Sequence, residues 1–306
     1  MRRTRPAFAL AIVLWIVAAL LLGVAFLSAL TRHNLELTRK LDDKLQARLL
    51  AQSVVEDLKY YILTSRFDNI SLLGDLNVSG FRFPERIVLD GRNYQMGTVR
   101  FSLRDLSSGI DVFYPDSAFI SRLLASPRER TLRYTIRDSI LDWTDRDNFV
   151  RLNGAERAYY ELTLHRPYGP RNDLGIQSVD ELRLIRGVRD IDPARWGRLK
   201  HYFYAKDRGT RYNLALFDET LLAALLNLNF LQAHDLERYR KTDFDKYITY
   251  ISGLKDFDET IMGFALSFSI RIEVEARQGA ARSRIVTTVD FHGFSGRIIT
   301  YGYRSY

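Results

Sequence analysis

The sequence predicts an α+β fold with a long N-terminal helix, an antiparallel sheet and a large helical domain inserted between the strands. Three observations indicate this arrangement. An uncharged apolar segment covers residues 7–30, and alternating apolar residues typical of strands occur around 86–103 and again at 266–291. A helical pattern fills residues 115–254, between the two groups of strands.

The apolar segment is long enough to cross a membrane. Its 24 residues contain no charge and would extend about 36 Å as a helix, which exceeds the hydrocarbon core of a bilayer. Arg2, Arg3 and Arg5 precede it, so we expect a cytoplasmic N-terminus, a transmembrane segment at 8–30 and the remaining chain outside the cytoplasm. A cleavable secretory signal is the alternative, although its apolar region is usually shorter.

Beyond the apolar segment the helical pattern continues. No Gly or Pro occurs between Gly23 and Gly74, and leucines recur at every fourth position from Leu37 to Leu49. We therefore expect one helix from Phe8 to about Leu63, whose second half packs on a globular domain. The alternative is a simple anchor followed by a separate helix.

The rest of the chain divides by its periodicity. Residues 31–114 hold the amphipathic helix and the first strands, 115–254 form the inserted helical domain, and 255–306 supply the strands that complete the sheet. Helices are expected at 116–125, 131–143, 153–162, 178–185, 218–228 and 236–254. Prolines at 127, 167, 170 and 193 indicate loops between them.

Composition excludes several classes of protein. The 306 residues are 46% hydrophobic and contain no Cys, which rules out a disordered chain, disulfides and thiol chemistry. The net charge is +8, of which the three N-terminal arginines supply three, so the remaining +5 gives weak support for a polyanion-binding surface. The five histidines are scattered and no nucleotide-binding or hydrolase motif occurs, so we do not expect an enzyme.

Residues 181–188 resemble a helix-hairpin-helix segment, in which Arg183, Arg186 and Arg189 would contact phosphates. Four acidic residues surround these arginines: Asp180, Glu181, Asp190 and Asp192. We therefore favour a capped helix ending at a Gly turn, and expect no nucleic-acid partner.

Four acids predict a calcium site in the helical domain. Asp145 and Asp147 lie in a loop just after a helix, Asp142 belongs to the preceding helical turn, and Glu156 opens the next expected helix. Calcium requires six to eight oxygen ligands, which carboxylates, carbonyls and water can supply. The alternative is that these acids form solvated ion pairs with nearby arginines, namely Arg137, Arg146, Arg151 and Arg157.

Several segments resemble one known family. They are the run from Ala7 to Val17, the acidic run 141–147, Gly154-Ala155-Glu156 with Tyr159-Tyr160, Asn172 ahead of 178–182, and Gly187-Val188. In this order they resemble protein K of the bacterial type II secretion system, a family of minor pseudopilins. The resemblance implies a pilin-like fold with an inserted helical domain, and it implies bound calcium at the acidic segment.

The resemblance also implies a function. A prepilin peptidase would remove the leader 1–7 between Ala7 and Phe8, where the family usually has Gly before the cleaved bond. The mature protein would be a single-pass protein of the bacterial inner membrane with its bulk in the periplasm. It would initiate assembly at the tip of the pseudopilus together with minor pseudopilins I and J and support protein export across the outer membrane.

Most pilin-like subunits have Glu at the fifth mature position, where this chain has Ile12. A tip subunit has no subunit above it to neutralise such an acid, so its absence fits a tip position. The competing interpretation is a membrane-anchored periplasmic binding or sensor domain that acts alone.

Overall fold

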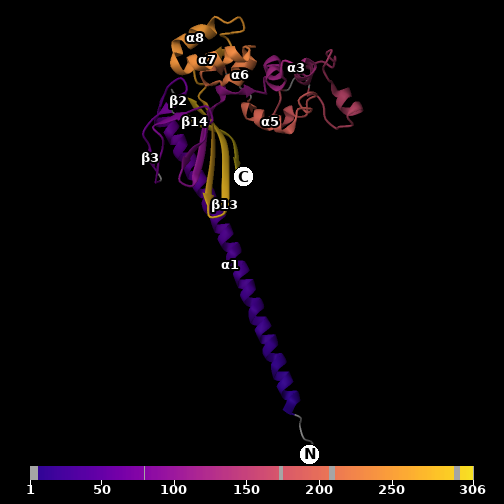
Figure 1. The fold of residues 1–306 in the computed structure, drawn as a ribbon, viewed down its shortest axis with the longest axis vertical. Helices are drawn as coiled ribbons and strands as arrows, with labels where there is room; N and C mark the ends of the chain where they lie inside the picture. The colour runs from indigo at the N-terminus through magenta and orange to yellow at the C-terminus, as the bar shows by residue number, and fades with distance from the viewer. Residues whose placement is uncertain (1–5, 79, 172–174, 207–210, 293–296, 306) are drawn as a thin grey trace, which may run out of the picture.

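The protein is a long helical rod that carries a globular head at one end (Figure 1). The computed structural model describes residues 6–306 except 79, 172–174, 207–210, 293–296 and 306. Helix α1 (Pro6–Thr64) is continuous over 59 residues, as expected. Its apolar first half stands clear of the head, and within the described residues α1 is the one helix long and apolar enough to cross a membrane.

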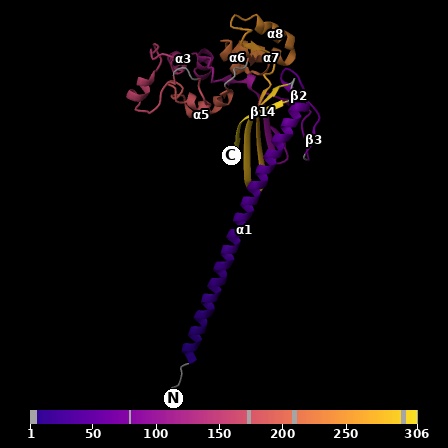
Figure 2. The same cartoon turned by 180° about the vertical axis from the view of Figure 1, so that it is seen from behind.

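A five-stranded antiparallel sheet packs against the upper part of α1 (Figure 2). Its strand order is β14-β13-β12-β7-β6, comprising β6 (Tyr94–Met96), β7 (Val99–Asp105), β12 (Ser269–Gln278), β13 (Ala281–His292) and β14 (Arg297–Ser305). Ala51, Val54 and Leu58 of α1 are fully buried in the same core as Ile272 and Val274 of β12. Alternate residues of β7 and β12 face this core, which is the pattern that the sequence predicted.

Strands β7 and β12 are hydrogen-bonded neighbours although more than 160 residues separate their paired positions. The chain leaves the sheet after β7, forms the helical domain and returns as β12. This arrangement confirms the α+β fold with an inserted helical domain. Strand β14 lies within residues 255–306, which were expected to supply strands, although no alternating pattern was identified at its own position. It pairs with β13 across a bulge between Val286 and Thr288.

Short strands complete the head. A three-stranded sheet is formed by β1 (Arg66–Phe67), β2 (Ser71–Leu73) and β5 (Arg86–Val88), and β3 (Asn77–Val78) pairs with β4 (Phe81–Arg82). Two parallel pairs join distant segments, β8 (Ile110–Asp111) with β9 (Phe203–Tyr204) and β10 (Tyr212–Asn213) with β11 (Met262–Gly263). The first pair closes the segment 112–202 and the second closes the segment 214–261, so each half of the helical domain is held at its own two ends.

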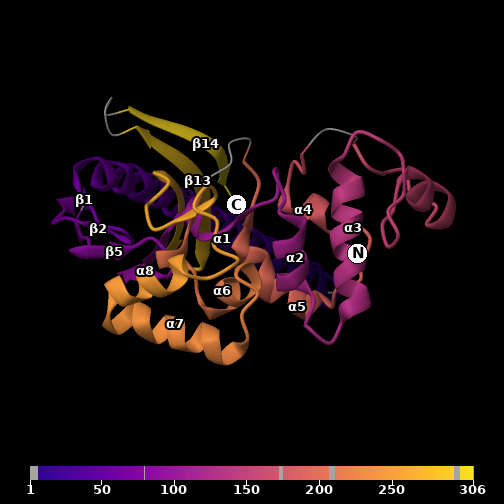
Figure 3. The same ribbon diagram turned by 90° about the horizontal axis from the view of Figure 1, so that it is seen from above.

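The helical domain has two groups of helices, which Figure 3 shows side by side from above. One contains α2 (Ser117–Leu124), α3 (Arg130–Thr144), α4 (Val179–Leu182) and α5 (Pro193–Leu199). The other contains α6 (Glu219–Leu225), α7 (Phe230–Thr242) and α8 (Phe244–Ser252). Both contribute to one core, which includes Phe119, Trp143, Phe217 and Tyr247.

Three expectations for this domain were wrong. The helix expected at 236–254 is two helices, because Asp243 adopts non-helical dihedrals and its side chain caps α8 by accepting a bond from Lys246 N at 3.0 Å. The helix expected at 153–162 is reduced to a π-helical turn, Tyr159–Thr163, because Asn153 is held to Asp138 of α3. Pro193, expected in a loop, begins α5, where its missing N–H costs no hydrogen bond.

Candidate metal centre in the helical domain

Three of the four predicted acids converge at the end of α3. One carboxylate oxygen from each of Asp142, Asp145 and Glu156 lies within 4.8 Å of the others. Asp142 occupies the last turn of α3, Asp145 is the residue that ends this helix, and Glu156 follows the loop that returns to it. Asp142 and Glu156 are buried, with 0% and 3% of their surface exposed.

Gly154 allows the returning loop to approach α3 this closely. A Cβ atom added to it would lie 1.9 Å from Oδ2 of Asp142, so any other residue would collide with the carboxylate. The Arg186 side chain donates to the Gly154 carbonyl at 2.8 Å, and both the backbone and the side chain of Asn153 donate to Asp138 Oδ2. These bonds fix the loop, and with it Glu156, against the end of α3.

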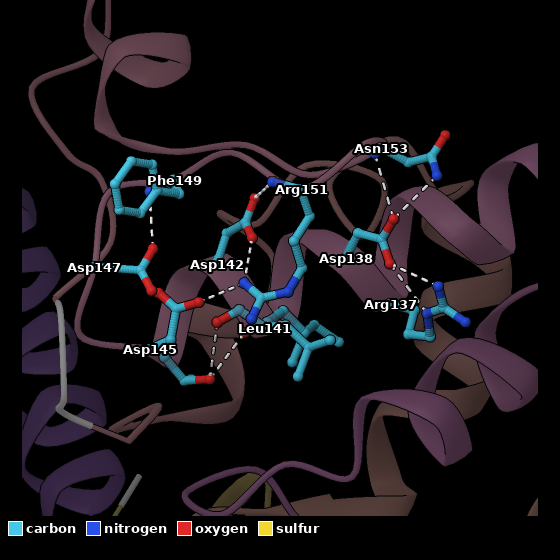
Figure 4. Close-up of polar contacts among 11 residues, drawn as sticks. Arg137, Asp138, Leu141, Asp142, Asp145, Asp147, Phe149, Arg151 and Asn153 are labelled. Carbon is cyan, nitrogen blue, oxygen red and sulfur yellow. Dashed lines mark hydrogen bonds and ion pairs between the residues drawn. The ribbon is translucent and has the colours of Figure 1, made fainter.

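Arg151 lies between two of the acids (Figure 4). Its Nη1 donates to Asp142 Oδ1 at 2.7 Å and also to Asp145 Oδ2, and its backbone N–H donates to Asp142 Oδ2 at 3.2 Å. The two carboxylates raise the pKa of Arg151 above its usual value. One guanidinium therefore compensates two carboxylates, and the third acid of the cluster has no such partner.

Glu156 is that third acid. Neither of its carboxylate oxygens has a hydrogen-bond partner among the described residues, and the same holds for Asp145 Oδ1. Burial, together with the charges of Asp142 and Asp145, raises the pKa of Glu156 to about 7. Buried polar atoms rarely lack partners, and unpartnered carboxylate oxygens beside two further carboxylates fit a hard divalent cation. The donor set thus matches calcium chemistry: all oxygen, with three acids.

Asp147, the fourth predicted ligand, lies outside this group. Its side chain is exposed, and its Oδ1 accepts a hydrogen bond from Phe149 N at 2.8 Å. The sequence reasoning did not identify Asp138, which positions the loop from its place one turn before Asp142 on α3. The spacing of these two acids, four residues apart on one helical face, was the available signal.

Two of the three arginines of the helix-hairpin-helix interpretation form hydrogen bonds within the domain. Arg183 Nη1 donates to the carbonyls of Val188 and Ile191, each at 3.0 Å, and Arg186 holds Gly154. Both guanidiniums also lie over aromatic rings, at 5.4 Å and 4.8 Å from the ring centres. These contacts favour a structural role for the two side chains.

Comparisons with known proteins find similarity to one family over the segment that contains the cluster. Residues 100–205 match the family model for protein K of the type II secretion system. The chain is 38% identical over 99 residues to type II secretion system protein K of Aeromonas hydrophila, an alignment that covers 31% of this chain and 29% of that protein. The matched segment is similar to the protein K family. It contains β7, α2 and α3 and all four predicted acids.

A solved structure extends the likeness in fold to most of the chain. It is the crystal structure of the GspK-GspI-GspJ complex from the type 2 secretion system of enterotoxigenic Escherichia coli, with a TM-score of 0.53 and 15% identity. The superposition covers 90% of this chain and 99% of the matched one. Most of the chain therefore has a fold shared with that structure.

Arg151 is expected to stabilise the end of α3 in the metal-free protein. Replacing it by Gln in metal-free protein should lower the free energy of unfolding by about 1 to 2 kcal/mol, because two close carboxylates lose their shared cation. Breaking a fully buried pair costs about 3 to 5 kcal/mol, and the Arg151 side chain is 38% exposed. Chemical denaturation in chelator measures the change. The control Arg157→Gln removes an exposed pair with Glu161 and should have little effect; equal losses in both variants would contradict the assignment.

Metal-free protein should also become less stable as the pH rises. The pKa of Glu156 is about 7 in the folded state against an ordinary value of 4.5, so the folded state holds this proton more tightly. The stabilisation of the folded state by this proton is complete below about pH 4.5 and is lost as the pH rises through about 7. In chelator, the free energy of unfolding of wild type relative to Glu156→Gln should fall by about 2 to 3 kcal/mol between these limits. A difference independent of pH would show that Glu156 titrates normally.

Proposed function

We propose that this chain is a minor pseudopilin that occupies the tip of a type II secretion pseudopilus. The observation that carries the proposal is the position of the helical domain, which lies beyond the sheet at the end of α1 opposite the N-terminus (Figure 1). A subunit stacked above would meet this domain, whereas the exposed side of α1 remains available to subunits alongside or below. In this role the protein would initiate assembly and support export across the outer membrane.

The partners we propose are minor pseudopilins of types I and J, since the structure with the same fold is a complex that contains GspI and GspJ. The contact surface would be the exposed side of α1. The test is co-purification of the full-length protein in detergent with candidate I and J proteins. Recovery of a stoichiometric complex is expected. A monomer in the presence of every candidate, without neighbours in membrane crosslinking, would instead favour an anchored domain that acts alone.

We further propose that the segment 8–30 lies in the inner membrane, with the N-terminus cytoplasmic and the head periplasmic. Support comes from the exposed apolar side chains of α1, such as Leu14, Trp15 and Leu22, which are 66%, 78% and 72% exposed. Such a surface requires lipid or apolar partners.

Leader removal is a separate part of the proposal. Ala7 and Phe8 lie within α1, and the rest of the leader includes residues 1–5, which lie outside the described part of the chain. We expect intact mass, measured on protein from a host with prepilin peptidase, to give a mature chain that begins at Phe8. A chain that begins at Met1 or near Thr31 would rule this out.

The third part of the proposal is a structural calcium ion held by Asp142, Asp145 and Glu156. The support is the unpartnered, buried carboxylate of Glu156 beside two other acids. When bound, calcium would supply a positive charge and coordination sites for oxygens that lack donors. The protein itself would position the ligands: Gly154 and Asn153 hold the loop against α3, and Arg151 would still donate hydrogen bonds to Asp142 and Asp145.

A further inference from the structure

A cavity of about 710 Å³ lies where the sheets meet the helical domain. The turn after β5 and the outer face of β7 line one side, and the segment before α6 together with α7 and α8 lines the other. In Figure 1 this is the region where the helices α6–α8 stand above β2 and the upper end of α1. The volume lies within the range of about 300 to 1,000 Å³ that is typical of ligand sites.

The charge of the lining is positive. Five of its side chains are cationic: Arg86, Arg92, Arg104, Arg240 and Lys241. The two carboxylates of the lining, Asp90 and Asp218, are already engaged by their own chain. Arg92 holds Asp90 through Nε at 2.9 Å and Nη2 at 2.6 Å, and Asp218 caps α6 while accepting the hydroxyl of Tyr202.

Arg104 differs from the other cations of the cavity. Arg86, Arg92, Arg240 and Lys241 each form an ion pair with a carboxylate. Arg104 forms none with any described residue, and its hydrogen bond from Nη1 to the His201 carbonyl is long, at 3.4 Å. The side chain is half-buried and held against Gly91, where an added Cβ would lie 2.5 Å from its Nε.

The position of Arg104 in the sheet adds a second indication. Arg104 and Arg271 are directly opposite each other on β7 and β12, a pairing of like charges that destabilises a sheet. Burial and the charge of Arg271 lower the pKa of Arg104, and together they outweigh the opposing charges of Asp90 and Asp218. Arg104 is thus a guanidinium partly removed from water, next to another cation and in direct ion-pair contact with no carboxylate of the described residues, and an external anion would stabilise it.

We propose that this cavity binds a carboxylate-bearing polypeptide segment, with Arg104 as its main anion contact. A planar guanidinium matches a carboxylate through two parallel hydrogen bonds. The cavity is larger than a single small anion requires, and Ile70, Leu216 and Phe244 add apolar surface that would contact neighbouring side chains of a peptide. No residue of the acidic cluster lines the cavity, so the proposal does not depend on the tip role or on calcium.

The test measures the fluorescence anisotropy of a labelled hexaglutamate peptide with full-length protein in detergent. We expect saturable binding that weakens with salt, and no binding of the neutral hexaglutamine peptide. Arg104→Gln should weaken the binding about tenfold or more, because one charge-assisted contact is lost. The matched control is Arg100→Gln, which removes the same charge from the same face of β7 outside the cavity and should change the affinity less than about twofold.

A second variant and a competition with phosphate complete the test. Arg104→Lys retains the charge without the planar fork, so it should weaken binding while leaving the unfolding temperature unchanged, and it carries the test if Arg104→Gln does not fold. Equal losses in Arg104→Gln and Arg100→Gln would show unspecific attraction and overturn the proposal. Wild-type affinity in Arg104→Lys would overturn the role of the guanidinium. Complete displacement of the peptide by inorganic phosphate at the same molar concentration would identify a small-anion site instead.

Discussion

Calcium is expected to raise the unfolding temperature of the full-length protein by roughly 5 to 10 °C at a concentration about a hundredfold above its dissociation constant. Binding to the folded state alone at that excess stabilises by about 2.7 kcal/mol. For a folded region of this size, each kcal/mol shifts the midpoint by about 2 to 4 °C. The physical reason is Glu156, whose two buried carboxylate oxygens have no partner among the described residues of the metal-free protein.

The variants separate this site from general charge effects. Asp145→Asn combined with Glu156→Gln should abolish the shift, because these substitutions remove two of the three converging acids. Asp147→Asn should retain most of it, since Asp147 lies outside the cluster. The double variant should also be more stable than wild type in chelator, as fewer like charges are brought together. The assignment fails if wild type shows no shift, or if the double variant shifts as much as wild type.

The sequence predicted those features that depend on periodicity. The core of α1 and the sheet follows from apolar residues repeated at helical spacing around Val54 and Leu58 and at alternate positions such as Ile272 and Val274. Each pattern arises because one face of a single helix or strand is buried, so a short stretch of sequence is enough to recognise it. The inserted domain was predictable for the same reason, because the period changes on both sides of it.

Features that depend on a single side chain or on a distant contact were not predictable. Asp243 divides one apolar helical pattern into two helices by capping the second, and an Asp within such a pattern carries no unique signal. From the sequence, any of four arginines could pair with the acids. Arg151 does so because the loop passes close to α3 at Gly154 and brings its side chain to Asp142. The same loop path brings Glu156 to Asp142 and Asp145. Asp147 lies outside this group, and its Oδ1 accepts a hydrogen bond from Phe149 N.

Charges introduced on the exposed side of α1 should disrupt association with partner pseudopilins. Leu41 and Leu45 are 62% and 55% exposed, while Ala51 and Val54, on the side that packs against the sheet, are fully buried. Replacing both leucines by Glu leaves the sheet contacts of the head intact. If these side chains are covered in the assembly, the change removes about 1.5 to 3 kcal/mol of apolar burial for each leucine and adds the cost of burying charge.

Affinity for the I and J partners should therefore fall at least about a hundredfold, measured by co-purification and by titration in detergent. Leu152→Glu is the matched control, because Leu152 is 97% exposed but lies on a loop of the helical domain, which the proposed tip position leaves uncovered. That variant should bind as wild type does, and the Leu41 and Leu45 variant should keep the wild-type unfolding temperature. Unchanged affinity in the Leu41 and Leu45 variant would mean that the proposed partners bind another face of the protein. Two charges cannot be accommodated in an apolar helix interface without a measurable loss of affinity.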